Sequence, residues 1–283
     1  MSSLGLLLLG TVVLLGVVVL DRVARHLVRP VPVQPDRTVR DTGLIYEDFT
    51  VLSGSHRLHA WLLSDGEVRH EEPLLILAHG WGASYGTVLQ LAEPLVDEGH
   101  EVLLFDMRGH GRNKPASFVT VRHFKDDLMS VLGYAGKRFP GRKLIVIGHS
   151  FGGAASVLAA ADGADIDKLV LIAAPSDVLR ITAEYLTDKG MPGRLVVWVL
   201  RPFWWLRNAG TFRSLTPSRR ISEVEVPLLI IQPEDDARVT RDHARQLSAA
   251  SGVPHHVVPH CDHTSVLGAT MTTRLVTEFL YTW

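Results

Sequence analysis

The chain has almost no cysteine and almost no net charge. Cys261 is the only cysteine among 283 residues, which excludes an intrachain disulfide and removes one sign of an oxidising compartment. The 29 lysines and arginines stand against 30 acidic residues, for a formal net charge of −1. Such a balance leaves no basic excess to neutralise phosphates, so it argues against a nucleic-acid partner. Hydrophobic residues make up 46% of the chain, which is enough for a sizeable core.

The N-terminus differs from the rest of the chain because it lacks charge. Residues 4–20 are Leu, Val and Gly with a single Thr, and the first charged side chain is Asp21. As a helix this run would be about 26 Å long, close to the minimum that crosses a hydrocarbon core. Neither a basic start nor a small-residue cleavage site is present, so we expect a membrane anchor over residues 1–28. A cleaved export signal is the alternative.

Arginines follow the apolar run and predict its orientation. By the positive-inside rule they belong on the cytoplasmic side, which predicts a single-pass protein with a cytoplasmic catalytic domain. These arginines are Arg22, Arg25, Arg29, Arg37 and Arg40.

Beyond a proline-rich linker at residues 29–43, strand-like and helix-like segments alternate through residues 44–283. Segments 45–52 and 57–63 predict an antiparallel hairpin. Six further strands are predicted at residues 74–78, 101–105, 143–147, 168–173, 227–231 and 256–258. Helical patterns occur at residues 86–98, 121–139, 151–161, 241–250 and 265–281. Strands joined by helical crossovers predict an α/β fold, with a mostly parallel eight-stranded sheet covered by helices on both faces.

The alternation is interrupted once, between the strand ending near Ala173 and the strand starting at Pro227. The intervening stretch is far longer than one crossover needs, and it holds half of the six tryptophans. We expect a short helical cap at about residues 175–226, inserted over the carboxyl edge of the sheet, where α/β sheets bind ligands.

The segment Gly148-His149-Ser150-Phe151-Gly152-Gly153 stands between an apolar strand and a helix of small residues. A serine on such a turn, with glycines two residues before and after it, is typical of a nucleophile elbow. The turn strains the serine backbone, and a side chain at either flanking glycine would collide with its neighbours. Ser150 is therefore the candidate nucleophile, with its hydroxyl projecting into a cleft.

A serine hydroxyl needs a base, which is normally a histidine oriented by an acid. In hydrolases with this elbow the chain order is Ser, then Asp or Glu, then His. The histidine candidates are His263 and His260, after the last strand. The acid candidates lie in loop 234–236 after the seventh strand, with Asp177 more distant. A metal site is disfavoured, since no zinc signature matches the spacing of His255, His256, His260 and His263.

With these pieces together, residues 44–283 resemble the α/β-hydrolase superfamily. The resemblance rests on the elbow, on His79-Gly80-Trp81-Gly82 after the third strand, and on three other segments. Those segments are residues 105–113, the acid loop 234–239 and the histidine loop 258–264. The elbow and the His-Gly-Trp-Gly loop look most like the branch of monoacylglycerol lipases, serine aminopeptidases and esterases.

The resemblance implies a role for each site residue. Asp236 would be the triad acid, with Asp235 as the second choice, and His263 would be the base because it abuts the last helix. The amides of Phe151 and Trp81 would form the oxyanion hole. Two positions depart from the family pattern. Pro233 stands where a glycine is usual before the acid, and Asn113 stands where a serine is usual.

The resulting expectation is a membrane-anchored serine hydrolase that cleaves carboxylic esters through an acyl-enzyme, with no metal or cofactor. The apolar, aromatic cap predicts a hydrophobic small-molecule ester or a lipid as substrate. A thioesterase, amidase or peptidase would use the same residues. There are also two non-catalytic alternatives. One is a binding protein on a hydrolase scaffold, and the other is a membrane-tethered module whose cap docks a partner through an exposed apolar patch.

Overall fold

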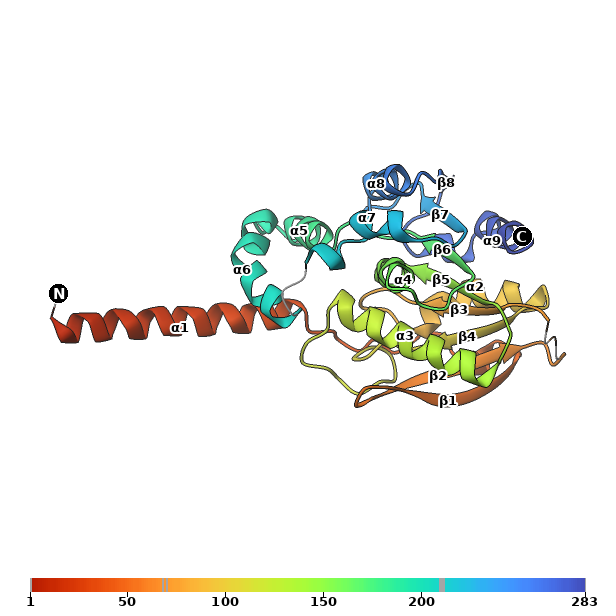
Figure 1. Cartoon of the computed structure of the whole chain (residues 1–283), viewed down its shortest axis with the longest axis horizontal. Coiled ribbons are helices and arrows are strands. Elements are labelled where there is room, and N and C mark those ends of the chain that lie inside the picture. The colour runs from red at the N-terminus through yellow and green to blue at the C-terminus, as the bar shows by residue number, and fades with distance from the viewer. Residues whose placement is uncertain (1, 68, 70, 209–211, 283) are drawn as a thin grey trace.

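The computed structural model describes residues 2–67, 69, 71–208 and 212–282. Its core is one eight-stranded sheet in the order β1-β2-β4-β3-β5-β6-β7-β8. Strand β2 runs antiparallel to both of its neighbours, and all other neighbouring strands are parallel. The predicted eight-stranded, mostly parallel sheet with an antiparallel edge hairpin is therefore confirmed (Figure 1).

The strands and helices follow the predicted order closely. The strands are β1 Ile45–Ser53, β2 His56–Ser64, β3 Leu74–Ala78, β4 Glu101–Phe105, β5 Leu144–His149, β6 Lys168–Ile172, β7 Leu228–Pro233 and β8 His255–Val258. The helices are α1 Ser3–Leu27, α2 Tyr85–Asp97, α3 Val121–Arg138, α4 Phe151–Ala161, α5 Val178–Asp188, α6 Gly193–Arg207, α7 Pro217–Arg220, α8 Arg241–Ser251 and α9 Thr270–Leu280. Short 3-10 turns lie at Val39–Asp41, Arg213–Leu215, Ile221–Glu223 and Ser265–Gly268.

Helices cover both faces of the sheet. Helices α3, α4 and α8 share one apolar cluster with one face, and α2 and α9 share a second cluster with the other. The central strands β3 and β5 are buried along most of their length, as expected for parallel strands between two helical layers. The small side chains of α4 allow that helix to pack closely on the sheet behind Ser150.

One predicted helix is interrupted. Residues 265–281 form a 3-10 turn, Ser265–Gly268, and then α9, which begins after Ala269. Ala269 has φ −76° and ψ 128°, so its extended backbone ends the turn before the α-helix starts. The turn leaves the histidine loop compact, since the main-chain amide of Leu267 donates to Thr264.

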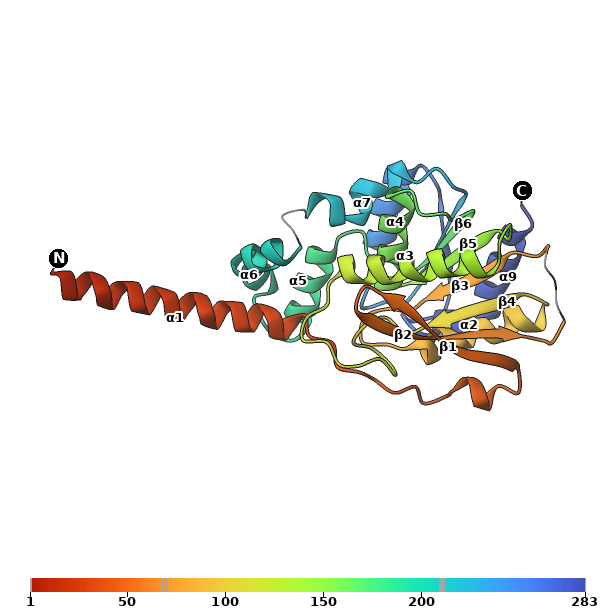
Figure 2. The same ribbon diagram turned by 60° about the horizontal axis from the view of Figure 1, so that its bottom comes forward.

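The region predicted as a cap contains α5, α6, α7 and two 3-10 turns between β6 and β7. Its residues 209–211 lie outside the described part of the chain. Helix α1 projects from the body of the molecule, and its C-terminal end lies beside α6 (Figures 1 and 2). By length and composition α1 could cross a membrane, a test that a signal sequence near an N-terminus also passes.

Candidate active site

Ser150 occupies a strained turn between β5 and α4. Its φ of 54° and ψ of −123° lie in a region that non-glycine residues rarely adopt. The close packing around it explains the glycines: a Cβ on Gly152 would lie 2.1 Å from the carbonyl oxygen of Ala78. A Cβ on Gly148 would lie 2.6 Å from Cα of Gly153. The elbow therefore holds the Ser150 hydroxyl in one place at the carboxyl end of β5.

His263 and Asp236 lie next to Ser150 in a continuous chain of hydrogen bonds. Nε2 of His263 is 3.0 Å from Oγ of Ser150, and Nδ1 of His263 is 2.8 Å from Oδ2 of Asp236. The other oxygen of Asp236 accepts hydrogen bonds of 2.8 Å from the amides of Arg238 and Val239. All three side chains are buried, so the carboxylate has a fixed position and orients the imidazole.

The alternative residues lie elsewhere. Asp235 and His260 are exposed to solvent, unlike the three buried residues of this series. Asp177 caps α5, where its Oδ1 accepts from the amides of Leu179 and Arg180 at 2.8 and 3.0 Å. Of the residues considered from sequence, the structure brings only Asp236 and His263 into hydrogen-bond contact with one another beside Ser150.

The two expected oxyanion donors flank Ser150. Phe151 is the first residue of α4, so its amide is one of the N–H groups that the helix leaves unpaired. The His-Gly-Trp-Gly loop lies against the elbow, because a Cβ on Gly80 would come within 2.8 Å of Ser150 Cβ. Trp81 follows Gly80 in this loop, and its ring lies 5.7 Å from that of Phe151.

Two buried histidines support the site, and sequence reasoning gave neither a role. Nε2 of His149 donates to the carbonyl oxygen of His263 at 2.8 Å and so connects the elbow to the histidine loop. Nδ1 of His79 donates to the Gly80 carbonyl at 2.8 Å, while its Nε2 accepts from the Met107 amide at 2.9 Å. Burial lowers the pKa of each of these two imidazoles to about 3, so both remain neutral. The only sequence signal was their position in the two motifs.

Aromatic side chains surround the nucleophile. Phe151 and Trp81 are half-buried, and both pack against Phe124, with ring centroids 5.8 and 6.1 Å apart respectively. His110 joins this cluster through Phe124 at 5.2 Å. Aromatic rings therefore pack against one another next to the elbow.

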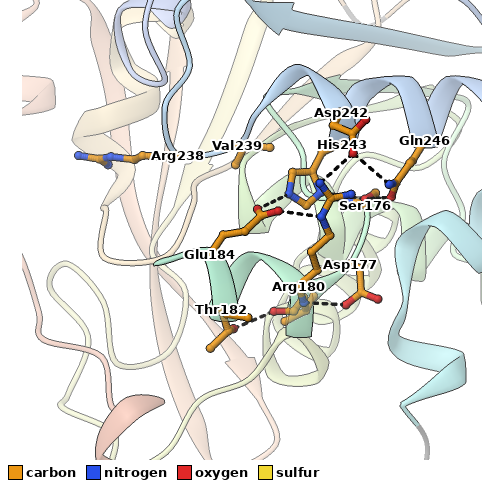
Figure 3. Close-up of polar contacts among 12 residues, drawn as sticks. Ser176, Asp177, Arg180, Thr182, Glu184, Arg238, Val239, Asp242, His243 and Gln246 are labelled. Carbon is orange, nitrogen blue, oxygen red and sulfur yellow. Dashed lines mark hydrogen bonds and ion pairs between the residues drawn. The ribbon is translucent and has the colours of Figure 1, made fainter. Parts of the chain in front are cut away.

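A polar network fastens the cap to α8 near the acid loop (Figure 3). Nδ1 of His243 on α8 accepts a hydrogen bond from the Ser176 amide at 3.1 Å. Its Nε2 donates to Glu184 on α5 at 2.9 Å. Arg180 bridges Glu184 and Asp242 at 2.7 and 2.8 Å. Burial alone would raise the pKa of Glu184, but the hydrogen bonds from His243 and Arg180 outweigh this and hold the pKa below its usual value. Ser176 is fully buried, so this second serine–histidine–carboxylate set has no access for a substrate.

A pocket of about 750 Å³ lies between α5, α6 and the loop after Asp236. Its lining includes Trp198, Arg238 and Leu179, but neither Ser150 nor His263. The pocket is thus beside the acid loop and is not the space into which the serine hydroxyl points. Within the described residues, no group of three or more His, Cys, Asp and Glu side chains is placed to hold a metal ion.

Comparison with known proteins agrees with this architecture. The model of the family described as serine aminopeptidase, S33, matches residues 69–205. A Bacillus subtilis protein, YqkD, described as uncharacterized, is 31% identical over 180 residues, which cover 59% of this chain and 56% of that protein. Rat (Rattus norvegicus) monoglyceride lipase is 28% identical over 155 residues, covering 54% of this chain and 50% of the lipase. The chain thus spans about half the length of these two relatives.

The fold is also similar to that of solved structures. The Pyrococcus furiosus esterase Pf2001 superposes with a TM-score of 0.71 at 21% sequence identity, covering 90% of this chain and 98% of the esterase. At this identity the likeness concerns the fold, which is the predicted α/β-hydrolase fold with its sheet of eight strands. The chain therefore has the α/β-hydrolase fold, and its sequence is similar to the serine aminopeptidase family, S33, and to a monoglyceride lipase.

Proposed function

We propose that this chain is a membrane-anchored serine hydrolase that cleaves carboxylic esters through an acyl-enzyme, with Ser150, His263 and Asp236 as its catalytic triad. The observation that carries the proposal is the unbroken series of hydrogen bonds from Ser150 Oγ through His263 to Asp236, at 3.0 and 2.8 Å. A buried serine–histidine–aspartate series on a strained elbow is the arrangement that nucleophilic acyl transfer requires.

In the first half of the reaction, Ser150 Oγ attacks the ester carbonyl while its proton passes to His263 Nε2. Asp236 Oδ2 accepts from Nδ1 and stabilises the imidazolium that forms. The negative charge on the carbonyl oxygen is held by the amides of Phe151 and Trp81. The tetrahedral intermediate then collapses, and the alcohol leaves with the proton from Nε2. This step leaves the acyl group on Ser150.

In the second half, water attacks the acyl-enzyme. His263 Nε2 takes a proton from this water, a second oxyanion forms in the same hole, and the carboxylic acid is released as Ser150 regains its proton. Asp236 keeps Nδ1 protonated throughout, because its Oδ1 is fixed by the Arg238 and Val239 amides.

The half-buried aromatic rings of Phe151 and Trp81 favour an ester with a hydrophobic acyl group. The monoglyceride-lipase relative is consistent with a lipid-like substrate. Helix α1 supports single-pass anchoring, since its exposed residues 6–19 are continuous and apolar apart from Thr11. The arginines that follow the apolar run, two of them in the last turns of α1, support a catalytic domain on the cytoplasmic side.

Turnover of a series of p-nitrophenyl esters of increasing chain length tests the proposal. We expect the full chain in detergent to hydrolyse them with an optimum at medium or long acyl chains, and Ser150→Ala to abolish turnover without unfolding the protein. Matched thioester and amide substrates show whether the ester is preferred. Equal turnover by Ser150→Ala would contradict the proposed nucleophile, and faster cleavage of the thioester or amide would contradict the ester assignment.

A further inference from the structure

Helix α1 contacts the cap, although the two lie far apart in the sequence. The indole Nε1 of Trp204 on α6 donates to the carbonyl oxygen of Ala24 on α1 at 2.9 Å. Arg207 on α6 forms an ion pair with Asp21 on α1. Ala24 is fully buried in the apolar cluster that forms the core of the cap, together with Trp204 and Leu200. The C-terminal turns of α1 are therefore part of the cap core.

This junction fixes the height of α6 relative to a bilayer. The part of α1 before the junction, residues 3–19, is mostly exposed, is apolar apart from Ser3 and Thr11, and is about 26 Å long at 1.5 Å per residue. That length is close to the thickness of a hydrocarbon core. Asp21 is the first charged residue after this apolar part, so the hydrocarbon core of the bilayer must end there. Arg207 of α6 forms an ion pair with Asp21. A bilayer crossed by α1 would therefore reach its surface at α6.

Helix α6 runs across the C-terminal end of α1 in Figure 1 and lies beside that end in Figure 2. If α1 crosses the bilayer, α6 lies along the bilayer surface, with one long side toward the lipid. The buried side is formed by Val197, Leu200 and Trp204, which pack on the cap core.

The opposite side of α6 is apolar and exposed. Its residues fall within a sector of about 100° on a 3.6-residue helical wheel. They are Leu195, Trp198, Pro202, Trp205 and Leu206. Trp198 is 70% exposed and Leu206 is 69% exposed, which are unusual values for large apolar side chains on a soluble domain.

Two arginines border this side. Arg194 and Arg201 are exposed at the rim of the pocket between α5 and α6, and neither is ion-paired in the described part of the chain, although the Arg201 guanidinium lies 5.5 Å from the centroid of the Phe212 ring. Their guanidinium groups can reach outward from the lipid boundary while their alkyl stems cover apolar surface. A helix with Trp and Leu on one side and arginines at its border has the chemistry of an interfacial helix on anionic lipid.

From this juxtaposition we infer that the outer side of α6, carrying Leu195, Trp198, Trp205 and Leu206, inserts into the surface of an anionic phospholipid bilayer as a second membrane attachment. The inference rests on the proposed anchoring by α1. The two attachments would hold the cap against the lipid, so that a substrate leaving the bilayer enters beside the cap. The exposed apolar patch that favoured a docking module is thereby assigned to lipid and not to a protein.

Depth-dependent quenching of single labels on the full chain tests this inference. In a Cys261→Ala background, an environment-sensitive fluorophore is placed by Trp198→Cys, Trp205→Cys, Leu9→Cys or Tyr281→Cys. Position 9 reports on α1. Position 281 is a matched control, because Tyr281 is a 64% exposed aromatic residue directly after α9, and α9 lies at the opposite end of the molecule from α1 (Figure 1). Each protein is reconstituted into phosphatidylcholine vesicles with or without phosphatidylglycerol, and the quencher is a phospholipid spin-labelled near the headgroup.

We expect blue-shifted, quenched emission at positions 198 and 205 and no quenching at position 281. Phosphatidylglycerol should strengthen quenching at 198 and 205, and Arg194→Gln with Arg201→Gln should remove this gain. Insertion of α1, read at position 9 with a quencher deep in the acyl chain, together with unquenched labels at 198 and 205, would overturn the inference while leaving the anchor intact. An unquenched label at position 9 would overturn the anchoring itself. Labels at 198 and 205 that respond only to added membrane proteins would assign the patch to a protein partner and also overturn the inference.

Discussion

Both carboxylate oxygens of Asp236 accept hydrogen bonds, so the effect of substituting this residue can be predicted. Oδ1 accepts from the amides of Arg238 and Val239, and Oδ2 faces Nδ1 of His263. In Asp236→Asn the side-chain amide would present an N–H or a neutral oxygen to His263, and the imidazole would no longer be held in the productive tautomer. We expect kcat to fall about 10⁴-fold, measured with a soluble short-chain ester.

Asp235→Asn is the matched control for this prediction. Asp235 is the neighbouring carboxylate, but it is exposed, and among the described residues Nδ1 of His263 pairs with Asp236 instead. Its substitution should change kcat by less than a few-fold. A larger loss of kcat in Asp235→Asn than in Asp236→Asn would identify Asp235 as the triad acid and contradict the triad as proposed.

The sequence alone could identify the nucleophile but could not separate the two aspartates. The Ser150 elbow is a local pattern, because the strand, the strained turn and the helix are consecutive in the chain. The choice between Asp235 and Asp236 depends on how the loop turns after β7, which the amides of Arg238 and Val239 fix. The support from His149 was missed for a similar reason, since its partner, the His263 carbonyl, is 114 residues away.

Among the elements, the crossing of α5 and α6 depends on one glycine. Gly193 is the first residue of α6, and a Cβ there would lie 2.0 Å from the carbonyl oxygen of Ala183 on α5. Gly193→Ala should therefore push the two cap helices apart and destabilise the protein by about 1–3 kcal/mol. The midpoint of chemical or thermal unfolding in detergent measures this.

Gly133→Ala provides the opposite control. Gly133 lies inside α3, where an added Cβ meets no atom within 4 Å. The substitution should stabilise the protein by about 0.5–1 kcal/mol, because alanine loses less backbone entropy in a helix. If both alanine substitutions shift the unfolding midpoint in the same direction, the close contact between α5 and α6 at Gly193 would be contradicted.

Most strands and helices were predictable because their signals are local. The apolar runs of β3, β4 and β6 began at the predicted residues, Leu74, Glu101 and Lys168. The break at Ala269 was missed although Gly268, which ends the 3-10 turn directly before it, is a local signal for the end of a helix. The packing of α1 on α6 was also missed, since an apolar segment long enough to span a membrane carries no signal that its last turns are buried against a distant helix.

At the scale of the whole molecule, stability should depend on several buried histidines. Burial lowers the pKa of His79 and His149 to about 3, and that of His110 and His123 to about 4. In the unfolded chain these groups take up protons near pH 6.5. Between that pH and the folded values the unfolded state binds more protons, so the free energy of unfolding falls as the pH falls. Asp106 acts in the opposite direction between about pH 6 and 4, because burial raises its pKa to about 6.

We therefore expect the unfolding midpoint to decrease steadily from pH 7 to pH 5. Each histidine contributes a slope of up to about 1.4 kcal/mol per pH unit, and Asp106 offsets about one of the four. Guanidinium titrations of the full chain in detergent at a series of pH values measure the dependence. A free energy of unfolding that is constant or rises on acidification over this range would contradict the neutral, buried state of these imidazoles.

The most direct test of the central claim is to locate a covalent adduct on the intact protein. Incubation of the full chain with a fluorophosphonate, followed by intact-mass and peptide mass spectrometry, should show one adduct per chain, on the peptide containing Ser150. The adduct should be absent from Ser150→Ala and from heat-denatured protein. Absence of an adduct on the folded wild type, or an adduct on a different serine, would contradict the assignment of Ser150 as the nucleophile of a serine hydrolase.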